Sequence, residues 1–167
     1  TTGAGDTFKK IFGSLSLDMI DHSYCPLYLV PPGASYAESK EVTYLSSDLK
    51  NDTLHLLYVG KLCAKNGSSL RLVHFRNSEK DEYDVKDTIA IMESYFPDVN
   101  YHIEIIDTDD FFQSIKELVT SDPKNLIVLS TKHRNIFQNL FHKSVTEFAA
   151  LNSISPLLIL SDKTIEP

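Results

Sequence analysis

From residue 41 onward, short apolar runs alternate with longer segments in which apolar residues recur every three or four positions. The short runs predict β-strands, and the helical spacing predicts α-helices. The expected strands cover residues 42–45, 69–75, 99–106, 126–129 and 156–160. The expected helices cover residues 53–65, 81–96 and 136–151, with one more that begins at Asp109-Asp110. Since every connection between strands is long enough to hold a helix, we predict an α/β fold with a five-stranded parallel, doubly wound sheet.

The first 33 residues do not fit this alternation. They contain one amphipathic segment, residues 8–22, and one apolar run, residues 27–30. A lone helix and strand cannot bury their apolar faces, so this segment must pack on something else. Pro31, Pro32 and Gly33 end the strand, and residues 34–40 read as a polar linker.

An internal repeat explains the extra helix and strand. Shifting the chain by 130 positions places Ser14 on Ser144 and Pro26 on Pro156, without a gap over about thirty positions. The shift is too long for a solenoid repeat and suits one α/β domain plus a linker. We therefore expect residues 1–33 to be the C-terminal helix and strand of a preceding copy, and residues 41–163 to be a complete second copy. The alternative is chance similarity between two amphipathic helix–strand units.

The glycine-rich start carries a family resemblance. Gly3, Gly13 and Ser14 match the last three fixed positions of the pattern Gly-x2-Gly-x9-Gly-Ser/Thr, and a helix and a Cys25-Pro26 strand follow. In these features the chain resembles the universal stress protein family, of the tandem-domain type. The resemblance implies an adenine nucleotide alpha hydrolase-like fold. The pattern's first glycine would precede Thr1, so we expect the chain to be part of a longer protein.

The resemblance implies a nucleotide site in the first copy of the parent protein. Glycines let backbone N–H groups approach phosphates, and a helix start favours an anion. The implied nucleotide-binding residues for ATP or a related nucleotide are Gly3, Gly5, Gly13, Ser14 and Ser16. The alternative is a glycine-rich turn that only packs tightly. The chain itself is not expected to bind ATP tightly, because the opening strands of the first copy are missing from it.

The second copy departs from the pattern. His133 and Lys143 replace two glycines, and their side chains would crowd a backbone phosphate cradle. We predict a degenerate site there, formed by the residues at the remaining family positions: Asp48, Ser130, His133, Lys143 and Ser144. The basic side chains form either a weak anion site or a solvated edge.

Composition narrows the function classes. The chain of 167 residues has a formal net charge of -7, which provides no footprint for nucleic acid or an anionic membrane. Cys25 and Cys63 form neither a disulfide framework nor a metal site, so reduced thiols and a cytoplasmic location are expected. Asp107, Asp109 and Asp110 read as an acidic helix start rather than a cation site.

The orphan strand suggests how the copies assemble. We expect the strand that begins at Leu27 and ends at Val30 to pair antiparallel with the strand between Leu157 and Leu160, within one chain or between chains as a dimer. The expected function is that of a stress-response protein whose first domain binds nucleotide and whose second domain serves assembly or another ligand. The alternatives are a slow ATPase or phosphoryl-transfer enzyme and a ligand-free scaffold. A binding module is favoured over an enzyme, because no catalytic residue and no convincing metal ligand is found.

Overall fold

The computed structural model describes residues 19–20, 24–31, 34, 39–46, 52–76, 85–131 and 144–161. Strands and helices alternate from residue 41 onward, as the hydrophobic pattern predicts. The strands are β1 (Leu27–Leu29), β2 (Glu41–Ser46), β3 (Ser69–Arg76), β4 (Tyr101–Asp107), β5 (Leu126–Thr131) and β6 (Leu157–Ser161). The helices are α3 (Thr53–Asn66), α4 (Lys86–Tyr95), α5 (Phe111–Val119) and α6 (Ser144–Asn152).

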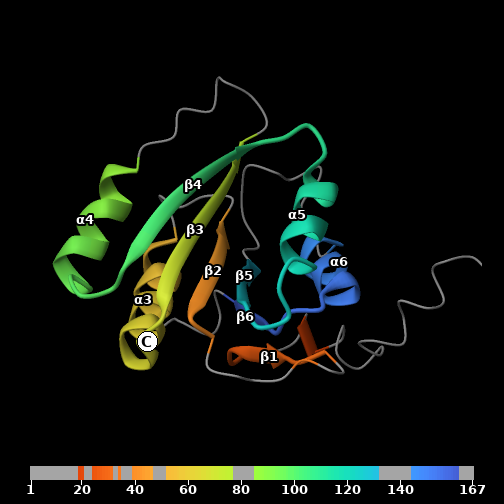
Figure 1. Ribbon diagram of the computed structural model, residues 1–167, viewed down its shortest axis with the longest axis horizontal. Coiled ribbons are helices and arrows are strands. Elements are labelled where there is room, and N and C mark those ends of the chain that lie inside the picture. The colour runs from red at the N-terminus through yellow and green to blue at the C-terminus, as the bar shows by residue number, and fades with distance from the viewer. Residues whose placement is uncertain are drawn as a thin grey trace, which may run out of the picture.

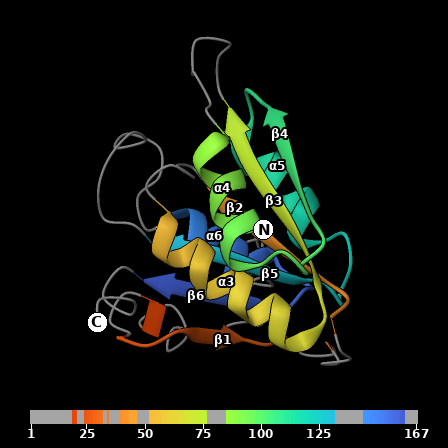
Figure 2. The ribbon, with the colours of Figure 1, turned by 90° about the vertical axis from the view of Figure 1, so that its left-hand side faces the viewer.

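The strands form one six-stranded sheet in the order β1-β6-β5-β2-β3-β4. Strands β2 to β6 are mutually parallel, which confirms the predicted α/β doubly wound sheet. Helices α3 and α4 cover one face, and α5 and α6 cover the other (Figures 1 and 2). Within the described ranges, no helix combines the length and apolar character that a membrane span needs.

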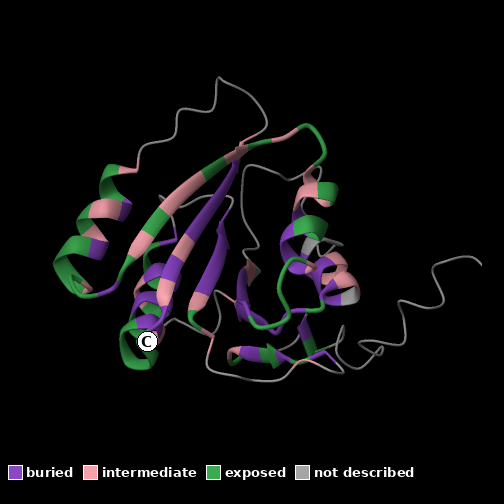
Figure 3. Ribbon diagram, viewed as in Figure 1, coloured by how far each residue is buried: buried purple, intermediate pink, exposed green. Residues whose placement is uncertain are grey.

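Each face of the sheet has its own apolar core. On one face, Leu56 and Val59 of α3 and Met92 of α4 pack with the sheet. On the other face, Ile115 of α5 and Ala150 of α6 do so. Figure 3 shows burial concentrated in the central strands, while the outward sides of the helices are exposed. The central strands are covered on both faces, as their continuous apolar runs predict.

The ends of the helices follow local rules. Helix α3 stops at Gly67, whose φ of 66° is a left-handed conformation that glycine adopts at low cost. Helix α4 ends just before Pro97, which cannot continue it. The Gln113 N–H donates to the Asp110 carboxylate at 3.0 Å, so Asp110 caps α5. Of the two acidic residues directly before α5, Asp109 and Asp110, the second therefore caps the helix.

The extra strand β1 lies at the edge of the sheet and pairs antiparallel with β6 (Figure 1). Its register places Leu27 opposite Ile159 and Leu29 opposite Leu157. These are the segments for which the sequence predicts a pairing. Met19 and Ile20 are helical, and Ile20 is buried in the core beneath α5 and α6. The rest of the expected helix over residues 8–22 lies outside the described residues.

Candidate functional site

The sheet has one topological switch point, between β2 and β5. From β2 the chain proceeds to β3 and β4 on one side, and β5 and β6 then extend the sheet on the other side. In open α/β sheets, ligands bind outside the carboxyl ends of the strands at such a point. The two strands end at Ser46 and Thr131, so the candidate site lies beyond these residues.

A buried polar cluster lies at the carboxyl end of β2. The Ser46 hydroxyl donates a hydrogen bond to Oδ2 of Asp52, which directly precedes α3. Oδ1 of Asp52 lies 3.7 Å from Nδ1 of His55, one turn into the helix. Nδ1 of His74, on the neighbouring strand β3, lies 3.2 Å from the Ser46 carbonyl oxygen. All four side chains are buried, so the cluster ties the start of α3 to two adjacent strands.

This cluster has the residue types of a hydrolytic triad but a different arrangement. The Ser46 hydroxyl donates its hydrogen bond to the Asp52 carboxylate, whereas the hydroxyl of a nucleophilic serine donates to an imidazole that acts as its base. Burial also keeps the hydroxyl away from a substrate in solution. Among the described residues, no three His, Cys, Asp or Glu side chains are grouped so that they could hold a metal ion. The geometry therefore fits a structural role beside a ligand site.

Two of the predicted site residues fall in the described part of the chain. Ser130 is half-buried near the carboxyl end of β5, directly after Leu129, which pairs with Leu45 of β2 beside the switch point. Ser144 is the first residue of α6. The remaining predicted site residues lie outside the described residues: Gly3, Gly5, Gly13, Ser14, Ser16, Asp48, His133 and Lys143.

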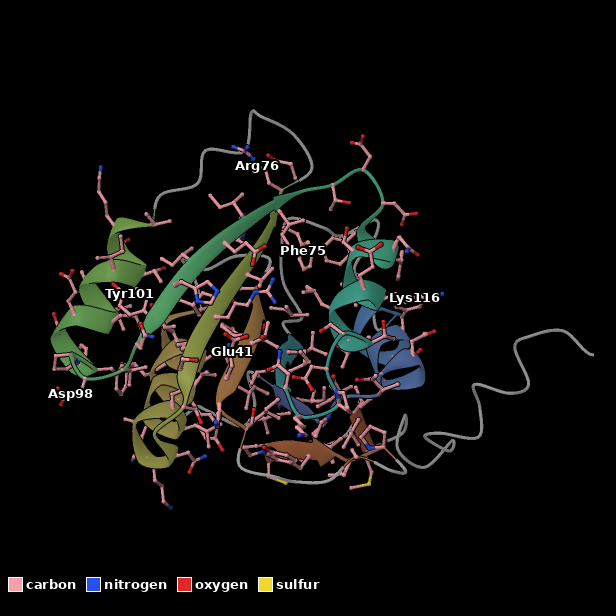
Figure 4. The ribbon with its side chains drawn as sticks, viewed as in Figure 1. Glu41, Phe75, Arg76, Asp98, Tyr101 and Lys116 are labelled. Atoms are coloured by element: carbon pink, nitrogen blue, oxygen red, sulfur yellow. The ribbon has the colours of Figure 1, made fainter. Side chains whose placement is uncertain are left out.

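An ion pair marks the carboxyl ends of β3 and β4. Nε and Nη2 of Arg76 lie 2.6 and 2.9 Å from Oδ1 and Oδ2 of Asp107 (Arg76 is labelled in Figure 4). Hydrogen bonding from Arg76 lowers the pKa of the Asp107 carboxyl below its ordinary value of 3.8, with a further coulombic contribution from the same guanidinium. The Asp107 carboxylate is thus engaged by a side chain of the neighbouring strand β3.

Sequence reasoning missed the cluster of Ser46, Asp52, His55 and His74. A weak signal exists, because polar residues follow the first strand and precede a helix at this end of the sheet. The sequence does not reveal that His74 belongs to the cluster, because this depends on the register that places His74 beside Ser46 on two parallel strands.

The solved structures to which this chain is similar include universal stress proteins. A universal stress protein of Archaeoglobus fulgidus superposes with a TM-score of 0.62 and 17% sequence identity, over 96% of this chain and 58% of its own. A universal stress protein in complex with cAMP superposes with a TM-score of 0.52 and 12% identity, over 75% of this chain and 98% of its own. A protein of unknown function from Pseudomonas aeruginosa has a TM-score of 0.58 and 14% identity, over 99% of this chain and 61% of its own.

These likenesses establish the fold. No protein-family model matches the sequence, and no curated protein sequence matches it. The chain spans less than two thirds of the length of the Archaeoglobus and Pseudomonas proteins, but nearly the whole length of the cAMP-bound one. The chain thus has the universal stress protein fold, with additional residues beyond one unit of that fold.

Proposed function

We propose that the chain belongs to a tandem universal stress protein and carries the end of its first domain and the whole of its second. In this proposal, the parent protein binds ATP or a related nucleotide through the first domain, during a cellular stress response. The second domain has a degenerate site and serves assembly or the binding of another ligand. A cytoplasmic location stays a prediction.

The observation that carries the proposal is the position of the glycine-rich segment relative to the switch point. The shift of 130 positions places residues 1–13 on residues 131–143, which begin at the last residue of β5. The same segment of the first domain would then follow that domain's own β5 equivalent, at its switch point. Backbone N–H groups in a glycine loop ahead of a helix suit the phosphates of a nucleotide. The similarly folded protein that binds cAMP supports a nucleotide as the ligand class.

Two features support the proposal that the second domain has lost this way of binding a nucleotide. His133 and Lys143 stand where the first domain has Gly3 and Gly13, and side chains there would occupy the space of a backbone cradle. In addition, the Asp52 carboxylate at the switch point is buried and accepts a hydrogen bond from the Ser46 hydroxyl. It therefore interacts with the protein interior and does not face a ligand in the site. The second domain thus offers a nucleotide neither the glycine loop nor this carboxylate.

The lengths of the similar structures support the tandem architecture. The cAMP-bound protein is covered almost completely by 75% of this chain, which is about one domain. The Archaeoglobus protein is covered to only 58%, yet it accounts for 96% of this chain, so it also matches residues beyond a single domain. A chain with one complete copy and the end of another would give this pattern.

Calorimetric titration with Mg-ATP tests the proposal on the 167-residue chain and on the longer parent protein. We expect one tight site per parent chain and no tight site on the 167-residue chain. Phosphate release measured on the same samples separates binding from hydrolysis, the slow ATPase being the alternative. Tight binding to the 167-residue chain, or none to the parent, would contradict the proposal. An absence of ATP binding to the parent protein would favour the alternative of a ligand-free scaffold.

A further inference from the structure

Helix α3 ends in the dipeptide Asn66-Gly67, the one place in the chain where glycine follows asparagine. Both residues are exposed, and no partner among the described residues holds the side-chain amide of Asn66. Beyond the adjacent residues, no atom lies within 4 Å of the position that a Cβ on Gly67 would occupy. The Asn66 side chain and the Gly67 backbone are therefore open to solvent together.

The chemistry available to this pair is a deamidation that needs only water. The Gly67 backbone nitrogen gives its proton to solvent and attacks the carbonyl carbon of the Asn66 side chain. Ammonia leaves as the new C–N bond closes a cyclic succinimide. Water then opens the ring at either carbonyl carbon, which yields aspartate or isoaspartate, the product whose backbone runs through the former side chain. Glycine permits the attack because no Cβ shields its nitrogen.

The end of α6 shows two restraints that Asn66 lacks. Asn152 is also the last residue of its helix, but its side-chain Nδ2 donates to the Phe148 carbonyl oxygen at 2.7 Å. The next residue is Ser153, which is buried and carries a Cβ. The amide of Asn152 is thus held in place and is followed by a hindered nitrogen. Neither restraint applies to Asn66.

One contact opposes the reaction in the folded chain. The Gly67 N–H donates to the Cys63 carbonyl oxygen, which also accepts from the Ser68 N–H at 3.1 Å. Both hydrogen bonds belong to the exposed end of a helix, and helix ends fray. Each opening of this cap frees the Gly67 nitrogen. We therefore expect the modification to proceed in the native chain, at a lower rate than in the unfolded chain.

The same cap leads directly into the contacts that anchor the connection between β1 and β2. The Ser68 hydroxyl donates to the Ser39 carbonyl oxygen at 2.6 Å, and the Ser69 N–H donates to the Lys40 carbonyl oxygen at 2.8 Å. An isoaspartyl bond adds one carbon to the backbone path just before Ser68 and Ser69 and displaces them. In addition, the new carboxylate stands at the negative end of the α3 dipole, where an anion is unfavourable.

We propose that Asn66 is a site of spontaneous modification, and that its conversion to isoaspartate weakens the anchor of residues 39–40 on the start of β3. The substrate is the folded chain itself, and water is the co-reactant. The modified form accumulates with the age of the protein. The inference rests on α3, β2 and β3 alone and does not depend on a preceding domain or on nucleotide binding.

Ageing the 167-residue chain at mildly alkaline pH tests the site, because base removes the Gly67 amide proton. Peptide mass spectrometry follows the change from amide to acid, and enzymatic methylation identifies isoaspartate. We expect Asn66 to be converted at least tenfold faster than Asn152, or than Asn100, which is exposed but precedes Tyr101. An Asn66→Gln variant should lose the isoaspartate signal. Conversion of Asn66 only in urea, or at the rate of Asn100, would overturn the site.

Amide hydrogen exchange tests the consequence on the aged form, purified by ion exchange. The Ser69 N–H should exchange at least tenfold faster than in the fresh chain. The Ile127 N–H, which donates to the Pro156 carbonyl oxygen at 3.0 Å, is the control and should be unchanged. Asn66→Asp adds the charge without the extra backbone carbon and should have a smaller effect on Ser69. Isoaspartate at position 66 with unchanged exchange of Ser69 would overturn the effect on the anchor.

Discussion

The Ser46 hydroxyl donates a hydrogen bond to the Asp52 carboxylate, and this contact joins the end of β2 to the start of α3. Both side chains are buried. Ser46 and Asp52 are six positions apart in sequence, so the bond spans the connection from β2 to α3. The switch point of the sheet lies at the carboxyl end of β2, where Ser46 stands.

Replacing Asp52 by Ala should destabilise the domain by about 1–3 kcal/mol, because a buried Ser46 hydroxyl loses its acceptor. Urea unfolding followed by circular dichroism measures the change in the free energy of unfolding. Asp98→Ala is the matched control, since Asp98 is exposed, and should change it by less than about 0.5 kcal/mol. A similar effect of both substitutions would mean that the buried bond contributes nothing to stability.

Gly60 of α3 lies against the ring of Phe96 at the end of α4, where a Cβ on Gly60 would overlap the ring edge. Overpacking of this kind costs about 1–3 kcal/mol, while alanine gains up to about 1 kcal/mol of helix propensity over glycine. We therefore expect Gly60→Ala to lower the thermal midpoint. In a Phe96→Leu background the same substitution should cost less. A higher thermal midpoint for Gly60→Ala alone would show that the Phe96 ring moves aside at little cost in free energy.

The ion pair between Arg76 and Asp107 predicts a pH dependence. The pKa of Asp107 is lower in the folded protein than in the unfolded chain. The ionised Asp107 carboxylate therefore stabilises the fold at pH values above 3.8, and this stabilisation is lost as the pH falls through the folded-state pKa. Carboxyl-carbon NMR should show Asp107 titrating below 3.8 in the native protein and near it in Arg76→Gln. Arg71→Gln, which removes a guanidinium bonded to Glu104 instead, should leave the Asp107 titration unchanged.

The two thiols of the 167-residue chain should differ strongly in reactivity. Burial raises the pKa of the Cys63 thiol to about 12, so its reactive thiolate is scarce at neutral pH. A colorimetric thiol assay should find one rapidly reacting thiol in the native chain and two after unfolding in urea. Two rapid thiols in the native chain would indicate that the core around α3 opens readily.

The sequence could predict much of the fold because apolar periodicity and helix stops are local. One strand boundary differs from the expected one because a local turn precedes the strand. Strand β4 begins at Tyr101 rather than at Val99, because the Val99 N–H donates to the Phe96 carbonyl oxygen at 3.0 Å and belongs to the turn. The Asn100 carbonyl oxygen then accepts from Leu70 of β3.

The candidate site was less predictable than the fold. Ser46 and His74 lie 28 positions apart and meet only because β2 and β3 pair in one register. No local pattern specifies this register. The glycine-rich motif was readable because the function proposed for it depends on backbone positions within one short segment, whereas the buried cluster depends on packing between elements.

The central claim is that the two copies are unequal and that only the first keeps the phosphate loop. The most direct measurement is ATP titration of the parent protein with a substitution at either of two equivalent positions. Gly13→Lys gives the first copy the residue of the second, and Lys143→Gly does the reverse. We predict that Gly13→Lys lowers ATP affinity at least tenfold, whereas Lys143→Gly leaves it within a factor of two. Equal effects of the two substitutions, or a larger effect of Lys143→Gly, would contradict the account.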